Sequence, residues 1–579
     1  MHASRRLRGA LRTLTARVVA LALLTALLLV GCGRREWPDD LLVLAVPTAA
    51  RTLDPRLAVD AASTRIWRLV FAGLTSVAPT GEVHLALAES LTATAWDSDG
   101  EPLAVIATLR PGLRFHDGRP VEAEDVACTW RSAMDPRLGS PVAGELARRV
   151  RAVTPLDARR VRFDLHAPLA TFASDLILGI VPRSACSQPN LALIEPIGAG
   201  EFAVVDAGDL AAVRLRRVGP TPAGAARSLL IRAVSDETGR LLSVLAGGAD
   251  LALGLSPLAL QAATGHRGAR LARAPGIAWT YLGLNTRDPA VADPRVRRAL
   301  SLAVDRAALV HALLDGRGRP APSMFPSGHW VAPPDFLPPA QDVAAAAALL
   351  DAAGLSADAA GVRLRLRLLV PPSRPRRREA DALAVALRAI GVEVTVRSLE
   401  LGTLLAELRA GRFQAFLLGL PEPLEPDYLG WMFHSANHPG APPRWPEAPA
   451  TPPTGLDCQP IVDAVRAAWL HDAAMEGLGL ATPRGAGNRT GVADPLLDCL
   501  LAIGRRRADR TLRAHAYHAA IHRLGELVPV ISLWHEDQVA LVHPRVGPTT
   551  PAADGRLSAY VDAPLAPRSD VTATLLEAP

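Results

Sequence analysis

Short apolar strands alternate with alanine-rich helical stretches along most of this 579-residue sequence, and this alternation restricts the possible folds more than any other feature. Strands are predicted at 41–47, 362–370, 392–399 and 413–419, because each is a mainly apolar run of strand length. The stretch 379–391 has helical spacing and closes with a glycine, which is typical of a helix end. Such alternation predicts an α/β protein. The chain is longer than the roughly 250–300 residues that one core usually fills, so two or three domains are expected.

Residues 281–310, "YLGLNTRDPAVADPRVRRALSLAVDRAALV", contain a predicted strand and a predicted helix with a clear boundary between them. "YLGLN" predicts a short strand. Asp293 and Pro294 predict the N-cap and the first position of the helix. The arginines of this helix are predicted to lie in solvent, opposite a buried face. That face is predicted because apolar residues recur every three or four positions, at Val296, Ala299, Leu300, Ala303, Val304 and Ala307.

The N-terminal residues 1–31 have the pattern of a secretory leader. Five arginines and no acidic residue precede an apolar run from Val18 to Val30. This run has about 13 residues, whereas a membrane-spanning helix needs about 20. The sequence Leu29-Val30-Gly31-Cys32 resembles a bacterial lipobox, which predicts that Cys32 is acylated and becomes the first residue of a lipoprotein. An ordinary signal peptide with an incidental cysteine is the alternative.

The charge of the chain does not favour nucleic-acid binding. The formal net charge is +6, and it falls to +1 when the five arginines of the predicted leader are removed. The sequence contains no lysine, so all of its Lys+Arg residues are arginines. Phosphate-loop lysines, Schiff bases and lysine general bases are therefore excluded.

Four cysteines remain besides the predicted lipidation site: Cys128, Cys186, Cys458 and Cys499. In an oxidising compartment four cysteines allow three pairings, and sequence spacing does not choose among them. None of them forms a Cys-x-x-Cys pair, so neither a structural zinc site nor a thioredoxin-like site is predicted.

Several polar motifs have simple structural interpretations. His116 and Asp117 in "FHDGRP" could form a proton-shuttling pair, but Asp117-Gly118 is a turn signal, so a turn is predicted. "WDSDGEP" (96–102) partly resembles a calcium loop but lacks its final glutamate, so a hairpin turn is predicted. "IGAGEF" (197–202) lacks the third glycine of a dinucleotide site, so a tight turn is predicted.

Three histidines, His515, His518 and His522, fall on one side of a predicted helix and could hold zinc or nickel. The buried face of this helix is marked by Tyr517 and its neighbours Ile521 and Leu524, which places the histidines at its flank or in water. His434 and His438 are weaker metal candidates. No metal site and no cofactor is therefore predicted.

Hydrolase motifs are absent from the sequence. It has neither a Gly-x-Ser-x-Gly elbow nor a His-Glu-x-x-His pair. An enzyme, such as a secreted hydrolase, is therefore not the predicted function.

Residues 281–310 closely resemble the signature of the bacterial extracellular solute-binding proteins of the oligopeptide, dipeptide and nickel type. In that signature a strand ending in Asn-Thr leads into an Asp-x-x-Val-Arg-x-Ala helix that ends near Asp-Arg. Further resemblances follow the order of the family from about residue 41 to about 545. They are "TLDPRLA" (52–58), "VFAGLTSVAPTGEVHLALAESL" (70–91), "ATLRPGLRFHDGRPVEAEDVACTWR" (107–131), "IGAGEF" (197–202), "LLDAAGL" (349–355) and "LVPVISLW" (527–534).

The resemblance implies a two-lobed α/β clamp of the periplasmic-binding-protein kind, with three domains and a hinge. The ligand would lie between the lobes. The implied division is a lipoprotein signal peptide (1–31), a tether (32–40), a discontinuous hinge-side domain one (41–78, 195–284 and 525–579), a small domain two (79–194) and a second lobe (285–524) with a proline-rich insertion at about 440–487.

The resemblance also implies a ligand site. In the family a carboxylate just before an Asp/Glu-Pro pair commonly meets the free ammonium of a peptide. Taking Glu425-Pro426 as that pair places Glu422 at this carboxylate, where the family usually has aspartate. A surface acid in a proline-rich loop is the alternative for Glu422. Strand-like pairing with the ligand backbone is implied for two segments, namely Ala61, Ala62 and Ser63, and Leu418, Gly419 and Leu420.

The predicted function is the lipid-anchored substrate-binding component of an ABC importer. It would capture a short peptide by hinge closure and pass it to the permease subunits in the membrane. The protein is expected to be a monomer, exported and anchored at the periplasmic or extracellular face of a bacterial membrane. The alternatives that keep the same clamp are binding of a nickel complex, haem or a sugar-like solute, and a role as a solute sensor.

Overall fold

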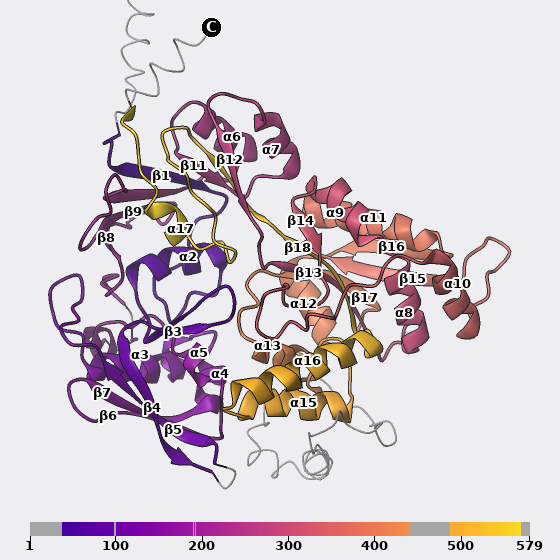
Figure 1. Cartoon of the computed structure of the whole chain (residues 1–579), viewed down its shortest axis with the longest axis horizontal. Helices are drawn as coiled ribbons and strands as arrows, with labels where there is room; N and C mark the ends of the chain where they lie inside the picture. The colour runs from indigo at the N-terminus through magenta and orange to yellow at the C-terminus, as the bar shows by residue number, and fades with distance from the viewer. Residues whose placement is uncertain (1–36, 98–99, 189, 192, 439–486, 569–579) are drawn as a thin grey trace, which may run out of the picture.

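The computed structural model of the chain describes residues 37–97, 100–188, 190–191, 193–438 and 487–568. These residues form two lobes (Figure 1). The lobe on the left of the figure holds a seven-stranded sheet and, below it, a four-stranded sheet. The lobe on the right holds a six-stranded sheet with helices on both faces. The predicted α/β class is confirmed.

The seven-stranded sheet has the order β12-β19-β11-β1-β10-β9-β8. Its central strand β1 (Leu41–Val46) is buried along its whole length, since helices cover both of its faces. α2 (Ala61–Val70) packs on one face, and α6 (Glu237–Leu245) and α7 (Pro257–Ala263) pack on the other. The other strands are β8 (Phe202–Asp206), β9 (Ala212–Arg217), β10 (Ser228–Ala233), β11 (Leu251–Leu253), β12 (Arg270–Ala274) and β19 (Gln538–Val542).

The four-stranded antiparallel sheet has the order β4-β5-β7-β6 and packs against α3 (Ala123–Met134). A disulfide between Cys128 of α3 and Cys186 ties this helix to the segment after the sheet. Cys499 is also disulfide-bonded. The remaining elements of this region are β2 (Thr75–Val77), β3 (Val83–Leu85), β4 (Ala88–Trp96), β5 (Pro102–Leu109), η1 (Pro136–Leu138), α4 (Ala143–Arg149), β6 (Val150–Pro155), β7 (Arg160–Leu165), α5 (Phe172–Asp175) and η2 (Arg183–Ser187).

The six-stranded sheet has the order β14-β18-β13-β17-β15-β16. Its strands are β13 (Trp279–Leu284), β14 (Gly318–Pro320), β15 (Leu364–Val370), β16 (Val392–Ser398), β17 (Ala415–Leu420) and β18 (Val530–Glu536). One face packs on α8 (Pro294–Leu302), α9 (Arg306–Leu314), α10 (Val343–Ala352) and α11 (Arg374–Arg388). The other face packs on α12 (Leu401–Arg409), α13 (Asp427–Phe433), α15 (Pro495–Arg506) and α16 (Arg510–Leu527). Short elements are η3 (Ser435–Asn437) and, near the C-terminus, α17 (Ser558–Val561).

Two connections carry the described chain from one lobe to the other. Residues 275–278 join β12 to β13, and Asp537 joins β18 to β19. The connections lie against each other, because the N–H of Glu536 donates to the carbonyl of Ala278 at 3.1 Å. Gly276 allows this approach, since a Cβ atom there would lie 2.1 Å from the carbonyl oxygen of Glu536.

The four predicted strands are confirmed as β1, β15, β16 and β17. The helix predicted at 379–391 is part of α11, which begins earlier, at Arg374, because Ser373 caps it by accepting from the N–H of Arg376. The ranges predicted for domain one, 195–284 and 525–579, each include one strand of the six-stranded sheet, β13 and β18 respectively.

The capped helix predicted after Asp293 is α8, on which Val296, Ala299 and Leu300 are buried. The helix ends at Leu302, earlier than predicted. Ala303 and Val304 are buried just beyond it, but Ala307 belongs to α9 and is exposed, so its predicted place on the buried face is wrong.

Two arginines were expected in solvent and are buried instead. Arg297 is 4% exposed and Arg306 is 5% exposed. The physical reason is that both guanidinium groups donate to backbone carbonyls, and Arg297 reaches the carbonyls of Leu527 and Val528 at the end of α16.

The described part of the chain contains no helix that is both long enough and apolar enough to span a membrane. The predicted leader, Cys32, Cys458 and the proline-rich stretch 441–455 lie outside the described residues.

Candidate functional site at the junction of the lobes

An ion pair joins the two lobes at the carboxylate predicted to contact a ligand. Arg68 lies near the end of α2 in the first lobe, and Glu422 follows β17 in the second. Nη1 of Arg68 donates to Oε2 of Glu422 at 2.8 Å, and the two side chains are 23% and 16% exposed. Glu422 is therefore turned toward the opposite lobe, where it binds a cationic group.

Ala61, Ala62 and Ser63 are helical, so the prediction of strand-like backbone at these residues is wrong. They form the first turn of α2, whose N-cap is Asp60. Oδ1 of Asp60 accepts from the N–H of Ser63, and the hydroxyl of Ser63 accepts from the N–H of Arg51. A capped helical turn has no strand edge, so it cannot pair with an extended ligand.

Leu418, Gly419 and Leu420 form the end of β17, which has a strand neighbour on one side only. β13 pairs with all three residues, whereas β15 pairs with β17 only at Ala415 and Phe416. The other edge of residues 418–420 therefore has no strand partner within the described residues. Such an open edge can accept an extended peptide as an added strand.

Arg376 of α11 lies over this open strand end. A Cβ atom at Gly419 would lie 2.6 Å from Nη2 of Arg376, so the glycine leaves room for the guanidinium group. Nη1 of Arg376 donates to Glu379 at 2.7 Å and to the hydroxyl of Thr280 at 3.3 Å. These two contacts hold a positive charge beside the backbone of β17.

Tyr428 and Trp431 of α13 add an aromatic wall, and each is 37% exposed. Their rings meet edge to face, with centroids 6.3 Å apart. Burial raises the pKa of Tyr428, and the charge of Glu422 raises it further, which places this ring near the carboxylate. The guanidinium carbon of Arg489 lies 5.6 Å from the centre of the Trp431 ring. This side of the second lobe thus combines aromatic rings with positive charge.

A cavity of 230 Å³ lies where the lobes meet. Trp67 and Arg68 of α2 and Ile177 line it from the first lobe, and Leu424 lines it from the second. Its volume is slightly below the roughly 300–1,000 Å³ of typical small-molecule sites, so it suits a small solute.

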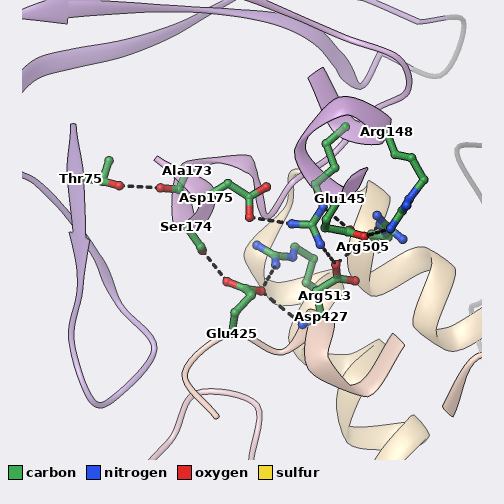
Figure 2. Close-up of polar contacts among 11 residues, drawn as sticks. Thr75, Glu145, Arg148, Ala173, Ser174, Asp175, Glu425, Asp427, Arg505 and Arg513 are labelled. Carbon is green, nitrogen blue, oxygen red and sulfur yellow. Dashed lines mark hydrogen bonds and ion pairs between the residues drawn. The ribbon is translucent and has the colours of Figure 1, made fainter. Parts of the chain in front are cut away.

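Helices α4 and α5 of the first lobe contact the second lobe through a partly buried polar network (Figure 2). The hydroxyl of Ser174 in α5 donates to the carboxylate of Glu425. Arg149 of α4 donates to Asp175 at 2.6 Å and to Asp427 at 3.3 Å, so it binds one carboxylate in each lobe.

Burial acts strongly on Glu425, a member of this network. Burial is the main reason that the pKa of Glu425 is raised to about 7, and the nearby charge of Asp427 acts in the same direction. Arg513 of α16, with Nη2 at 3.6 Å from Oε1 of Glu425, lowers the pKa but does not cancel the effect of burial. The carboxyl group therefore titrates near neutral pH while the lobes are in contact.

The histidines of α16 do not converge. His522 lies 3.5 Å from Asp335, and burial lowers the pKa of His518. Within the described ranges there is no group of three or more histidine, cysteine or acidic side chains that could hold a metal. His434 is buried and accepts from the N–H of Ala436, whereas His438 contacts Arg287 at 3.0 Å. The buried face predicted from Tyr517 is confirmed.

Two of the three polar motifs predicted as turns are confirmed, whereas residues 199–201 of the third, "IGAGEF", form a bend. In "FHDGRP" the N–H of Gly118 donates to the carbonyl of Phe115, and Nε2 of His116 contacts the carbonyl oxygen of Gly200 rather than Asp117. β4 and β5 form the hairpin predicted around residues 96–102. In "IGAGEF" a Cβ atom at Gly198 would lie 2.0 Å from the carbonyl oxygen of Val70, so this segment packs tightly on the end of α2.

Sequence reasoning missed Arg68, Arg376, Tyr428 and Trp431. Arg68 follows the apolar positions of α2 as an ordinary surface arginine would, and Arg376 stands in the run "RPRRRE" with nothing that distinguishes it from its neighbours. The usable signal was at Tyr428 and Trp431. Aromatic residues make up only 4% of the chain, and these two come soon after Glu422.

The fold and this junction can now be compared with known proteins. The sequence pattern of "Bacterial extracellular solute-binding proteins, family 5 Middle" matches residues 83–440, which is more than half of the chain. The chain belongs to this family. A relative, Protein XP55 of Streptomyces lividans, is 31% identical over 344 residues, and that match covers 56% of this family 5 chain and 61% of the relative.

Two further similarities extend over more of the chain. "Probable di/tripeptide-binding protein 5" of Pseudomonas aeruginosa is 24% identical over 479 residues, covering 78% of this chain and 82% of that protein. The crystal structure of NikZ from Campylobacter jejuni in complex with Ni(L-His) superposes with a TM-score of 0.68 at 21% identity, covering 90% of this chain and 98% of that one. This structural similarity confirms the periplasmic-binding-protein fold of the family 5 chain.

Proposed function

We propose that this family 5 protein is the capturing component of an ABC importer and that its ligand is a short peptide held between the lobes. The observation that carries the proposal is the position of Glu422, whose carboxylate already binds the cationic side chain of Arg68 across the junction. The ammonium group of a peptide has the same charge as that guanidinium group and, like it, donates hydrogen bonds without accepting any. The relative in Pseudomonas aeruginosa that carries a di/tripeptide-binding name supports this substrate class.

Three contacts would hold the peptide. Its ammonium would replace Arg68 on Glu422, its backbone would extend along the open edge of residues 418–420, and its carboxylate would reach Arg376. The charge-assisted hydrogen bond between the peptide ammonium and Glu422 would contribute on the order of 1.5–3 kcal/mol. Backbone pairing supplies affinity without reading side chains, so a range of short peptides would fit.

Hinge closure would couple binding to a change of shape. The two connections at 275–278 and at Asp537 are the places where the lobes could rotate relative to each other. A ligand that touches both lobes only in the closed form shifts the equilibrium toward that form. We place the domain boundaries at these connections, so that β13 and β18 belong to the second lobe, and we keep 79–194 as domain two.

The anchor is part of the proposal. Cleavage before Cys32 and acylation of its thiol would tether the protein as a monomer to the outer side of a membrane, in reach of the permease subunits. A single acyl chain anchors only marginally, so at least two chains are expected. Intact-mass measurement of the membrane-bound protein tests this, and Cys32→Ala should release the protein into the soluble fraction.

The substrate is tested by measuring peptide affinity for Glu422→Gln. Binding of peptides with a free amino terminus should weaken about tenfold or more, whereas binding of their N-acetylated forms should not change. Glu393→Gln is the matched control, because Glu393 forms an exposed ion pair with Arg365 at 3.1 Å in the same lobe. Equal losses for both peptide forms would refute the role of Glu422, and native mass spectrometry of the protein as isolated would identify a ligand that it carries.

A nickel chelate or another non-peptide solute is the second candidate. Arg489 near Trp431 forms no ion pair with a described carboxylate, and its positive charge suits a solute that carries carboxylates. The NikZ structure holds nickel together with histidine, a chelate of this chemistry. Metal analysis of the isolated protein separates this candidate from a peptide, and a transport assay in living cells separates an importer component from a solute sensor.

A further inference from the structure

A second cavity, of 260 Å³, lies within the second lobe and shares no lining residue with the cavity at the lobe junction. It exists because β14 is short. β14 pairs with β18 only from Trp534 to Glu536, so the first half of β18 has no strand on that side within the described residues. α8 and α16 lie on opposite faces of the sheet here, and the segment 336–339 closes the space between them.

The walls of this cavity are mainly apolar. Met324, Phe336, Phe433 and Leu524 contribute carbon surface from four different segments. Phe336 packs directly on α16, because a Cβ atom at Gly525 would lie 2.7 Å from its ring. The cavity is larger than the roughly 150 Å³ that suffices to bind benzene. It can therefore take a small apolar group.

Arg306 places a buried positive charge in this apolar wall. Its nitrogens donate to the carbonyl oxygens of Ser532, Ser301, Val304 and Pro339 and to the hydroxyl of Ser301, at 2.7–3.4 Å. None of these acceptors is a carboxylate, and no described acid forms an ion pair with Arg306. Burial lowers the pKa of Arg306 to about 10, and no nearby charge opposes that effect. A buried charge without a counter-ion is costly, so an anion in the adjacent cavity would be stabilised.

Two further groups at the cavity lack partners. Nε1 of Trp279 is buried and has no hydrogen-bond acceptor among the described residues, although the ring lines the cavity. Arg298 of α8 also lines the cavity and is exposed, without an ion pair to any described residue. A donor without an acceptor and a second cation thus lie beside the same apolar space.

We propose that this cavity is a second binding site, for a small carboxylic acid with an apolar body such as a medium-chain fatty acid. The carboxylate would lie between Arg306 and Arg298, and the hydrocarbon chain would lie along Phe336 and Leu524. The positive charge of the arginines favours a carboxylate in the ligand, and the apolar walls favour a hydrocarbon chain. The site lies within one lobe, so it does not depend on hinge closure or on the identity of the solute at the junction.

Calorimetric titration of the full chain with octanoate, octanol and octylammonium tests the proposal. Octanoate should bind at least about tenfold more tightly than octanol, and octylammonium should not bind. Arg298→Gln should bring the affinity for octanoate down toward that for octanol and leave octanol unchanged. Leu302→Trp should reduce the affinity for octanoate about tenfold or more, because the larger ring fills the cavity from α8.

The matched control is Leu258→Trp, at a position that is 70% exposed on α7 of the first lobe. It should leave octanoate binding unchanged. Equal affinities for octanoate and octanol would overturn the role of the two arginines. Unchanged octanoate binding by Leu302→Trp would overturn the location, and if that variant does not fold, unchanged binding by the surface variant Arg298→Gln would overturn the proposal.

Discussion

Nη1 of Arg68 lies 2.8 Å from Oε2 of Glu422, although 354 positions separate the two residues in the chain. The pair bridges the lobes at the carboxylate that is proposed to bind the ligand ammonium. On that proposal Arg68 would be an internal competitor for the ligand, because a peptide would have to displace it before its own ammonium could reach Glu422.

Removing this competitor should tighten binding. With Arg68→Gln, the affinity for peptides with a free amino terminus should rise by a factor of about 1.4 to 5, since a partly exposed ion pair contributes about 0.2–1 kcal/mol. Titration calorimetry with matched free and N-acetylated peptides measures the effect. The N-acetylated peptides should show no gain, and a gain for both forms would mean that Arg68 acts by packing rather than by competing for the carboxylate.

Closure of the lobes should depend on pH through Glu425. Burial at the contact raises the pKa of Glu425 to about 7 from a usual value of 4.5, so the closed form binds a proton more tightly than an open form that exposes the group. The closed form is then favoured at low pH, and the advantage is lost as the pH rises through about 7. The radius of gyration of the ligand-free protein should increase between pH 6 and pH 8, as measured by X-ray scattering.

Glu425→Gln should reduce that dependence, because the amide stays neutral and can still accept the hydrogen bond from Ser174. Burial also raises the pKa of Asp175, so a weaker dependence in the same direction should persist in this variant. If this variant kept the full pH dependence of the wild type, a group other than Glu425 would control closure of the lobes.

The connection at Gly276 should not tolerate a side chain. In Gly276→Ala, the added Cβ atom would lie 2.1 Å from the carbonyl oxygen of Glu536, so the two connections would have to separate. We expect a loss of about 1–3 kcal/mol in the free energy of unfolding, measured with urea. Gly144→Ala is the control, since the nearest atom to its Cβ would be Nη1 of Arg148 at 3.6 Å. That variant, on helix α4, should be neutral or more stable by up to about 1 kcal/mol.

Mild acid should destabilise the fold through His535. This side chain is fully buried in β18, and burial lowers its pKa to about 4 from 6.5. The unfolded chain therefore binds a proton first as the pH falls, and stability is lost from about pH 6.5 down through pH 4, by an amount on the order of 3 kcal/mol. Thermal unfolding across this range should show the decline.

His535→Gln should make the decline shallower, because the amide does not titrate. His329 shares the lowered pKa, at about 4, so part of the decline should remain. His311→Gln, at an exposed position of α9, should leave the dependence of stability on pH unchanged. If His535→Gln showed the same dependence as the wild type, His535 would not be the cause of the decline.

Local sequence signals predicted the helices and strands well, but they did not predict contacts between residues that are far apart in the chain. Apolar runs were enough to predict β1, β15, β16 and β17, because the side chains of a buried strand are themselves mainly apolar. The first turn of α2 had a local signal as well, because Asp60 is a good N-cap and Ile66, Trp67 and Val70 have helical spacing. The resemblance to a family suggested extended backbone there, and the local pattern was the better guide.

The buried arginines and the contacts between lobes could not be predicted in this way. Arg297 and Arg306 are buried because carbonyl groups from distant segments surround them, and the sequence around each arginine is that of a surface helix. Arg68 and Glu422 meet only after both lobes have formed. The prediction for Glu422 came from the resemblance to the family, in which a carboxylate precedes an Asp/Glu-Pro pair, and its role in ligand binding stays a prediction.

The place of β19 in the seven-stranded sheet has a consequence for biosynthesis. β12 has β19 as its sole neighbouring strand within the described residues, and β19 itself lies between β12 and β11. A nascent chain that has not yet reached residue 538 therefore has no partner for β12, so the sheet of the first lobe stays incomplete on the ribosome until that residue has been translated. A truncation that removes β19 should therefore leave a sheet edge open to aggregation.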